Sequence, residues 1–262
     1  MMSANGIAIH LSDTGEQDRT TLVFSNSLGT DFRIWDRVVP GLSRTFRIVR
    51  YDKRGHGLSE APASPYDMAD HVGDLEAVLD GLGIEKAIVA GLSVGGMIAQ
   101  GLAAKRPDLV RALILMDTAA RIGSVELWNE RIDAVRGGGI EAIADGVLQR
   151  WFPARFAGTR PAERAGWRAM LTRTPVEGYI GTMMALRDTD LTDQTATLTV
   201  PTLAICGADD AATPPELVRA TAGLIPGARY VEVPNAGHLP CIDQSEAVVQ
   251  AMSSFFKEHG FV

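Results

Sequence analysis

The sequence predicts an α/β fold with a mostly parallel central sheet, helices on both faces of the sheet, and a helical lid inserted before the penultimate strand. Short apolar, β-branched runs alternate with segments of helical periodicity, which is typical of a parallel sheet covered by helices. Between about 118 and 195 these strand signals stop, and the chain becomes helical and rich in Arg, Trp and Met. We therefore expect residues 1–117 and 196–262 to form the core and residues 118–195 to form the lid. A helical subdomain that only packs on the core is the alternative for this block.

Seven strands are predicted from the apolar runs. They lie near residues 6–11, 20–25, 47–51, 86–91, 111–117, 201–206 and 228–233. The fourth, fifth and sixth of these runs are apolar without alternation, as expected of strands that are buried on both faces. These three strands should therefore form the middle of the sheet.

Two helices near the C-terminus are predicted from their first residues. The segment Thr213-Pro-Pro-Glu216 offers an N-cap threonine, a proline at the first helical position and a glutamate at the third. The segment Asp243-Gln-Ser-Glu246 repeats the spacing from N-cap to glutamate. It precedes an apolar stripe made of Val248, Met252, Phe255 and Phe256. We expect this stripe to pack the last helix on the sheet.

Composition and charge exclude several classes of protein. The 262 residues carry 32 acidic and 25 basic side chains, a formal net charge of −7, and no run of Lys or Arg. Binding to nucleic acid or to an anionic membrane surface is disfavoured, because both require concentrated positive charge. The longest apolar runs, of roughly five residues, are far below the length of a bilayer span. With two separated cysteines and no signal-like start, a cytoplasmic location is expected; the oligomeric state is not predicted.

The most specific motif is Gly91-Leu-Ser93-Val-Gly95-Gly96, which follows a buried strand and precedes a helical run. In this context a G-x-S-x-G pattern forms a tight strand-to-helix turn that exposes the serine hydroxyl above the sheet. The helix behind Ser93 also directs its positive N-terminal end at the site. The motif indicates a nucleophilic serine, and an ordinary turn between strand and helix is the alternative.

A serine nucleophile needs a base, and His238 is the best placed of the five histidines. It lies in the polar loop 234–240, between the last strand and the final helix. The other four have structural interpretations: His10 in the first strand, His71 on a solvated helix face, His259 near the C-terminus, and His56 in a loop upstream of the serine.

The acid that orients the base should lie between Ser93 and His238, after the penultimate strand. The turn after residue 206 offers two adjacent carboxylates, Asp209 and Asp210. Only one of them can face His238, because neighbouring residues of an extended turn point in different directions. Composition and spacing do not decide between them.

These residues, in the order Ser93, Asp210, His238, resemble the catalytic residues of the α/β-hydrolase family. The similarity to the family covers nearly the whole chain. The segment Asp52–Ser59 is similar to the family's D-x-R-G-x-G-x-S turn, in which we interpret Arg54 and His56 as residues that hold the loop. The family's acid stands four residues before the proline of a G-x-x-D-x-x-x-P turn. The resemblance therefore implies Asp210, not Asp209, as the acid.

The chain departs from the family pattern after the first buried strand, and this departure indicates which members of the family it resembles most. Many members carry His-Gly after the first buried strand, where this chain reads Asn26-Ser-Leu-Gly29. The oxyanion hole uses backbone N–H groups, so the change is tolerable, and Leu28 and Val94 are implied as the donors. With the serine motif, the acid turn and two segments of the lid, this version is similar to the 3-oxoadipate enol-lactonases.

The resemblance implies a serine carboxylic ester hydrolase that acts on a small anionic lactone in aromatic catabolism. The alternatives are a broad-range carboxylesterase, a haloperoxidase-like or perhydrolase activity on the same triad, and a non-catalytic binding protein. A serine at the elbow disfavours the dehalogenase and epoxide-hydrolase branches, whose members use a carboxylate there. No sequence pattern indicates a metal site or a dinucleotide cofactor, so none is expected.

An enol-lactone carries a free carboxylate, which needs a cation or several donors when it is buried. We expect Arg131, Trp128 and Trp151 of the lid to bind substrate. Arg131 lies beside an apolar stripe and has no acidic residue three or four positions away. An arginine whose stem covers apolar surface while its head stays in water is the alternative. The next cations to consider are Arg150, Arg168 and Arg187.

Overall fold

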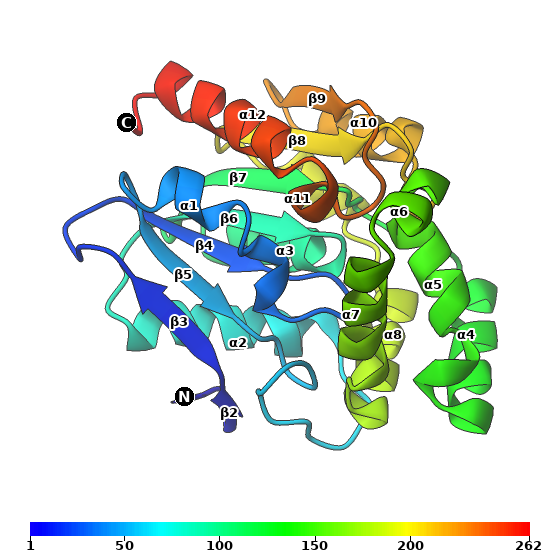
Figure 1. The fold of residues 1–262 in the computed structure, drawn as a ribbon. Helices are drawn as coiled ribbons and strands as arrows, with labels where there is room; N and C mark the ends of the chain where they lie inside the picture. Colours follow the sequence, from blue (N-terminus) through cyan, green and yellow to red (C-terminus); the bar gives the residue numbers. More distant parts are fainter.

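The computed structural model describes residues 1–262, and a seven-stranded sheet runs through its centre (Figure 1). Across the sheet the strands are β3 (Leu11–Thr14), β5 (Arg47–Tyr51), β4 (Thr21–Ser25), β6 (Ala87–Leu92), β7 (Val110–Met116), β8 (Thr202–Gly207) and β9 (Arg229–Val233). Only β3 is antiparallel to its neighbour. Every residue of β6 and β8 is buried, as the runs without alternation predicted. The α/β fold with a mostly parallel sheet is confirmed.

The first predicted strand, near 6–11, is wrong because the chain changes sheet within it. The segment β2 (Ile7–Ile9) pairs with β1 (Met2–Ala4) in a separate two-stranded hairpin, whereas β3 pairs with β5. His10 lies between β2 and β3, and its N–H donates to Ser59 Oγ at 2.8 Å. Because β3 pairs with a segment that is distant in the sequence, alternation along the chain does not show the break.

Helices cover both faces of the sheet (Figure 1). The short α1 (Val39–Leu42) packs on α12 (Ser245–Glu258), while α2 (Met68–Gly81) packs on α3 (Val94–Lys105), and α10 (Pro215–Leu224) covers β8. The helix α1 lies on one face of the sheet, and α2 and α3 lie on the other. The connection from β4 to β5 through α1 runs across the sheet in one direction, and those through α2 and α3 run in the other, so right-handed crossovers place them on different faces. As predicted, the stripe of α12 is fully buried. A one-turn helix, η1 (Phe32–Trp35), and α11 (Pro240–Asp243) complete this layer.

Both predicted N-caps are wrong. The first residue outside α10 is Pro214, and the Thr213 hydroxyl instead donates to Asp210 Oδ2 at 2.7 Å. The helix α12 is preceded by Gln244, and Asp243 instead accepts the N–H of Gly237 at 3.0 Å. In each case the side-chain oxygen that would cap the helix forms a hydrogen bond with another residue, Asp210 for Thr213 and Gly237 for Asp243.

Between β7 and β8 the chain forms helices joined by loops and no strand. This helical insertion comprises α4 (Val125–Gly138), η2 (Ile140–Ala142), α5 (Ala144–Trp151), α6 (Ala154–Thr159), α7 (Pro161–Thr172), α8 (Val176–Asp188) and α9 (Thr192–Ala196). Figure 1 shows α4 to α8 gathered at one end of the sheet. Its buried side chains, including Trp128, Ile132 and Met183, join the same apolar core as the sheet. None of the helices has both the length and the apolar character of a membrane span.

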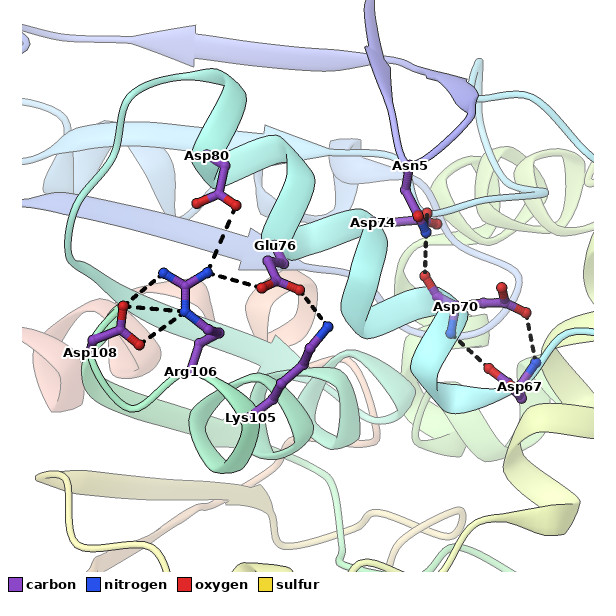
Figure 2. Close-up of polar contacts among 9 residues, drawn as sticks. All are labelled: Asn5, Asp67, Asp70, Asp74, Glu76, Asp80, Lys105, Arg106 and Asp108. Carbon is purple, nitrogen blue, oxygen red and sulfur yellow. Dashed lines mark hydrogen bonds and ion pairs between the residues drawn. The ribbon is translucent and has the colours of Figure 1, made fainter.

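Polar contacts fix α2 against its neighbours (Figure 2). Arg106, just after α3, contacts Glu76 of α2 at 2.9 Å and Asp108 at 2.7 Å. In the middle of α2, Asn5 donates to the buried carboxylate of Asp74 at 2.9 Å. Exposed ion pairs contribute about 0–1 kcal/mol each, so the contacts of Arg106 mainly fix the register of the two helices. Asp74 matters more, since it anchors Arg54 through two hydrogen bonds of 2.7 Å.

The prediction of a solvated His71 is wrong. His71 belongs to α2, its side chain is buried at 1% exposure, and neither ring nitrogen has a hydrogen-bond partner. Burial, together with the charges of Lys53 and Arg54, lowers the pKa of His71 well below its ordinary value. The two aspartates near it in sequence turn elsewhere: Asp67 caps α2 and Asp74 binds Arg54.

Candidate active site

Ser93 stands at the turn between β6 and α3. Its backbone has φ +59° and ψ −121°, which is a strained combination for a residue with a side chain. The end of β7 supports the strain: the N–H of Ser93 donates to the Met116 carbonyl at 2.9 Å, and the Thr118 hydroxyl donates to the Ser93 carbonyl at 2.6 Å. The predicted strand-to-helix turn is therefore present, with its serine at the position of the strain.

Two glycines of the motif are required by close packing. A Cβ on Gly91 would lie 2.1 Å from the Gly95 carbonyl oxygen, and a Cβ on Gly95 would lie 2.2 Å from the Ser25 carbonyl oxygen. Both distances are below any normal contact, and the groups they meet are backbone atoms that cannot move aside. The turn can therefore fold this tightly only with glycine at both positions.

Asp210 and His238 meet at the carboxyl end of the sheet, from the turns after β8 and β9. His238 Nδ1 lies 2.9 Å from Asp210 Oδ2, and both residues are buried. The carboxylate also accepts the Thr213 hydroxyl at 2.7 Å and the N–H of Ala212 at 2.7 Å. Asp209 instead points to the surface, 3.7 Å from Arg155. The structure thus brings Asp210, and not Asp209, to the histidine.

The surroundings of Asp210 favour its ionised form. Burial alone would raise the pKa of this carboxyl group, but the charge of His238 and the hydrogen bonds from His238, Thr213 and Ala212 outweigh burial and lower it. Because Nδ1 of His238 faces the carboxylate, Nε2 is the ring nitrogen left for a proton acceptor role. This arrangement has the geometry of a base and its orienting acid.

A third acidic group, Asp117, lies beside this pair. It follows β7, is fully buried, and accepts the Gly207 N–H at 2.8 Å through one oxygen, while its other oxygen has no partner. Burial, and then the charge of Asp210, raises the pKa of Asp117 well above its ordinary value. Asp117, Asp210 and His238 each offer an atom within 4.8 Å of the others. Since Asp210 Oδ2 and His238 Nδ1 already bond to one another, we interpret the group as an acid–base pair.

The raised pKa of Asp117 predicts how stability depends on pH. The folded protein keeps a proton that the unfolded chain releases near pH 4, so the free energy of unfolding falls as pH rises from about 4 toward the folded pKa. Asp117→Asn removes this loss, and its stability relative to the parent should grow over that range, by about 1.4 kcal/mol per unit of pKa shift. Urea denaturation at several pH values measures the difference, with Asp209→Asn as the control for losing one carboxylate. A difference independent of pH would contradict the prediction.

Leu28 and Val94 are the predicted oxyanion donors. Leu28 follows β4, lines the same cavity as Ser93, and its N–H has no acceptor within the protein. Val94 is the first residue of α3, so its N–H has no partner inside the helix. Both residues therefore carry a backbone N–H that is free to donate to a ligand.

Ser93 and His238 line one cavity of about 70 Å³. The helical insertion supplies most of the remaining wall, through Leu127, Trp128 and Arg131 of α4, Val147, Arg150 and Trp151 of α5, and Tyr179 and Leu186 of α8. A larger cavity of about 640 Å³ lies between His10, Asp52 and α7, and it contains none of the residues predicted for the site. The chemistry-bearing residues identify the smaller cavity as the candidate active site.

Arg131 and Arg150 are the cations of this cavity, and neither has a salt bridge or a hydrogen bond within the protein. Arg131 lies over the ring of Trp128, at 5.0 Å from its centroid. Burial lowers the pKa of Arg131, and the nearby charge of Arg150 adds to that effect. No acidic residue lines the cavity. In contrast, Arg168 pairs with Glu141 and Arg187 with Asp188, so they are not free for a ligand.

The predicted contacts Trp128 and Trp151 both line the cavity and are 4% exposed. The indole N–H of Trp128 is used within the protein, since it donates to the Ile122 carbonyl at 2.7 Å. Tyr179 was not predicted, although its buried side chain lies in the same wall. No local pattern marks it, because a tyrosine in a helix of apolar residues is indistinguishable from a core side chain.

Comparisons with known proteins agree with this geometry. A model described as the alpha/beta hydrolase family matches residues 22–251. The chain is 31% identical to 3-oxoadipate enol-lactonase 2 of Acinetobacter baylyi, over 98% of this chain and 96% of that protein.

Among solved structures, an enol-lactonase from Burkholderia xenovorans is similar with a TM-score of 0.95 and 39% identity, covering 98% of this chain and 99% of that one. A thermophilic esterase from Thermogutta terrifontis, solved with malate bound, has a TM-score of 0.90 and 31% identity, covering 96% and 94%.

Proposed function

Because the chain belongs to the α/β-hydrolase family, we propose that it hydrolyses a small carboxylate-bearing enol-lactone, namely 3-oxoadipate enol-lactone, to 3-oxoadipate in the catabolism of aromatic compounds. The observation that carries the proposal is that Arg131 and Arg150 line the cavity of Ser93 and His238 and that neither forms a salt bridge within the protein. Both arginines are partly buried, and a cation withdrawn from water is stabilised by a charge partner, which a substrate carboxylate would supply. The similarity to two enol-lactonases supports this choice of substrate.

In the first half of the reaction, Ser93 Oγ attacks the lactone carbonyl while Nε2 of His238 takes the hydroxyl proton. Asp210 holds the imidazole by its Nδ1–H and stabilises the imidazolium that forms. The N–H groups of Leu28 and Val94 stabilise the developing oxyanion. Ring opening then breaks the bond between the carbonyl carbon and the enol oxygen, and the imidazolium returns its proton to the leaving enolate, which gives the ketone.

In the second half, water attacks the serine ester and His238 takes a proton from that water. Collapse of the second tetrahedral intermediate breaks the ester bond, and the imidazolium returns the proton to Ser93 Oγ. The products are free enzyme and 3-oxoadipate, which carries the original carboxylate and the new one. The new carboxyl group releases its proton to solvent to become that second carboxylate.

Parallel assays of the enol-lactone and of p-nitrophenyl acetate test the substrate class. We expect a much larger kcat/KM for the lactone, because only the lactone carries a carboxylate for the arginines. Equal values would favour a broad-range carboxylesterase, for which the similarity to the Thermogutta esterase is the supporting observation. Peracid formation from acetate and hydrogen peroxide, without lactone hydrolysis, would favour the perhydrolase alternative.

Arg131→Met and Arg150→Met should each weaken hydrolysis of the anionic lactone by about 1.5–3 kcal/mol in transition-state stabilisation, the range for a charge-assisted hydrogen bond. Methionine keeps much of the apolar stem and removes the charge. Hydrolysis of p-nitrophenyl acetate should hardly change, and kcat/KM for both substrates measures the difference. Arg168→Met is the matched control, because this arginine of α7 is paired with Glu141 outside the cavity. A parallel fall on both substrates would mean that the arginines only hold the insertion in shape.

A further inference from the structure

The segment Asn26–Thr30 carries the proposed oxyanion donor, and several of its polar groups are fixed by hydrogen bonds. The Asn26 side chain donates to the Tyr51 carbonyl and accepts the indole N–H of Trp35, both at 2.8 Å. The Gly29 N–H donates to His56 Nε2 at 3.0 Å, and the Thr30 N–H to the Ser27 carbonyl at 3.3 Å. The N–H groups of Ser27 and Leu28 have no acceptor in the protein, and both residues line the cavity.

Lys53 is the least expected of the groups beneath this segment. Its side chain is 1% exposed, in a turn that reads as polar in the sequence. The amine forms no salt bridge; Nζ donates to the Ser27 carbonyl at 2.5 Å and to the Thr30 carbonyl at 3.4 Å. Burying an amine is costly unless the hydrogen bonds it makes compensate, so the site has a specific use for these two contacts.

The Ser27 carbonyl and the Leu28 N–H belong to one peptide unit. A peptide is planar and trans, so fixing the direction of its oxygen fixes the direction of its N–H on the opposite side. A donor on the oxygen also polarises the unit and strengthens its N–H as a donor, because hydrogen bonds in a chain reinforce one another. We infer that Lys53 is a positioning residue that orients and polarises the Ser27–Leu28 peptide as an oxyanion donor; this inference rests on the proposed serine mechanism.

His56 supports the next peptide in a complementary way. Its Nδ1 donates to the Arg54 carbonyl at 3.0 Å, which leaves Nε2 as the acceptor for the Gly29 N–H. Burial, and then the charge of Lys53, lowers the pKa of His56 well below its ordinary value, so the ring is neutral as an acceptor must be. Burial also lowers the pKa of Lys53 to about 7, against the charges of Asp52 and Asp31. Charged or neutral, the amine keeps N–H donors for the Ser27 carbonyl.

The test uses Lys53→Met, which keeps the length of the side chain and removes every donor. Its kcat for p-nitrophenyl acetate should fall by about 10- to 100-fold, somewhat less than the loss of an oxyanion donor itself, with KM nearly unchanged. Phenyl trifluoromethyl ketone adds to an active serine and forms a hemiketal oxyanion, so its inhibition constant should rise by a similar factor. The corresponding alcohol, 1-phenyl-2,2,2-trifluoroethanol, forms no oxyanion and should bind the variant and the parent equally.

Two further proteins separate this role from general damage to the turn. Arg54→Met changes the same turn without touching the Asn26–Thr30 segment, since Arg54 binds Asp74 and Asp70. It should lower the melting temperature but leave the ratio of ketone to alcohol affinity as in the parent. Lys53→Gln retains an N–H donor and should recover part of kcat. An unchanged kcat in Lys53→Met, or equal losses in ketone and alcohol binding, would overturn the inference. If the ketone binds the parent and Ser93→Ala equally weakly, the serine mechanism itself is wrong.

Discussion

Ser93→Ala and His238→Ala should each lower kcat for the lactone by about 10⁴ to 10⁶, the range found when one member of a catalytic unit is removed. Ser93 is the proposed nucleophile at the strained turn, and His238 is the proposed base, whose Nδ1 lies 2.9 Å from Asp210. Single-turnover and steady-state rates measure the loss, and unchanged melting temperatures would show that the fold is intact.

The double variant Ser93→Ala/His238→Ala distinguishes a joint role from two separate ones. Residues that act in the same step lose their effect together, so the double variant should be hardly slower than either single variant. If the two loss factors multiplied, Ser93 and His238 would act independently, and the proposed triad would be wrong.

Asp210→Asn should lower kcat by about 10⁴, the loss expected when a histidine is left in the wrong tautomer. Both oxygens of Asp210 accept hydrogen bonds, one from His238 and Thr213 and the other from Ala212 and Thr213. An asparagine amide in either orientation places an NH₂ group against at least one of these donors. To relieve the clash at the histidine, the ring must shift its proton to Nε2, which then cannot accept from Ser93.

Asp209→Asn is the matched control for this prediction. It changes the adjacent carboxylate, which is exposed and lies 3.7 Å from Arg155. Its kcat should stay within a small factor of the parent's, and pH–rate profiles of the two variants should differ accordingly. The reverse ranking would show that Asp209 orients the base in solution.

The elements that sequence predicted well are those whose signal is local. The strand near 86–91 became β6 (Ala87–Leu92), and the G-x-S-x-G pattern became the turn it predicted, because packing that tight requires glycine at 91 and 95. The stripe of α12 was also read correctly, since burial of a helix face depends only on helical period.

The errors share a physical cause, which is competition from partners distant in the sequence. Thr213 has the chemistry of an N-cap, but Asp210 takes its hydroxyl. His71 has acidic neighbours typical of a solvated face, but α2 turns it inward. Lys53 looks like an ordinary polar-loop residue, and no local feature reveals that it lies under the Ser27 carbonyl.

By itself, then, the sequence determined the α/β fold and the strained serine turn, since each depends on a local pattern: the period of the apolar residues and the glycines of one turn. Asp210 as the acid was implied by the resemblance to the α/β-hydrolase family and not by a local pattern. The tertiary structure decided which groups are paired. It left Asp209 at the surface, paired Arg168 and Arg187 with acids, and left Arg131 and Arg150 free in one cavity. Pairing depends on distances between segments far apart in the chain, and those distances are fixed only when the helices pack on the sheet.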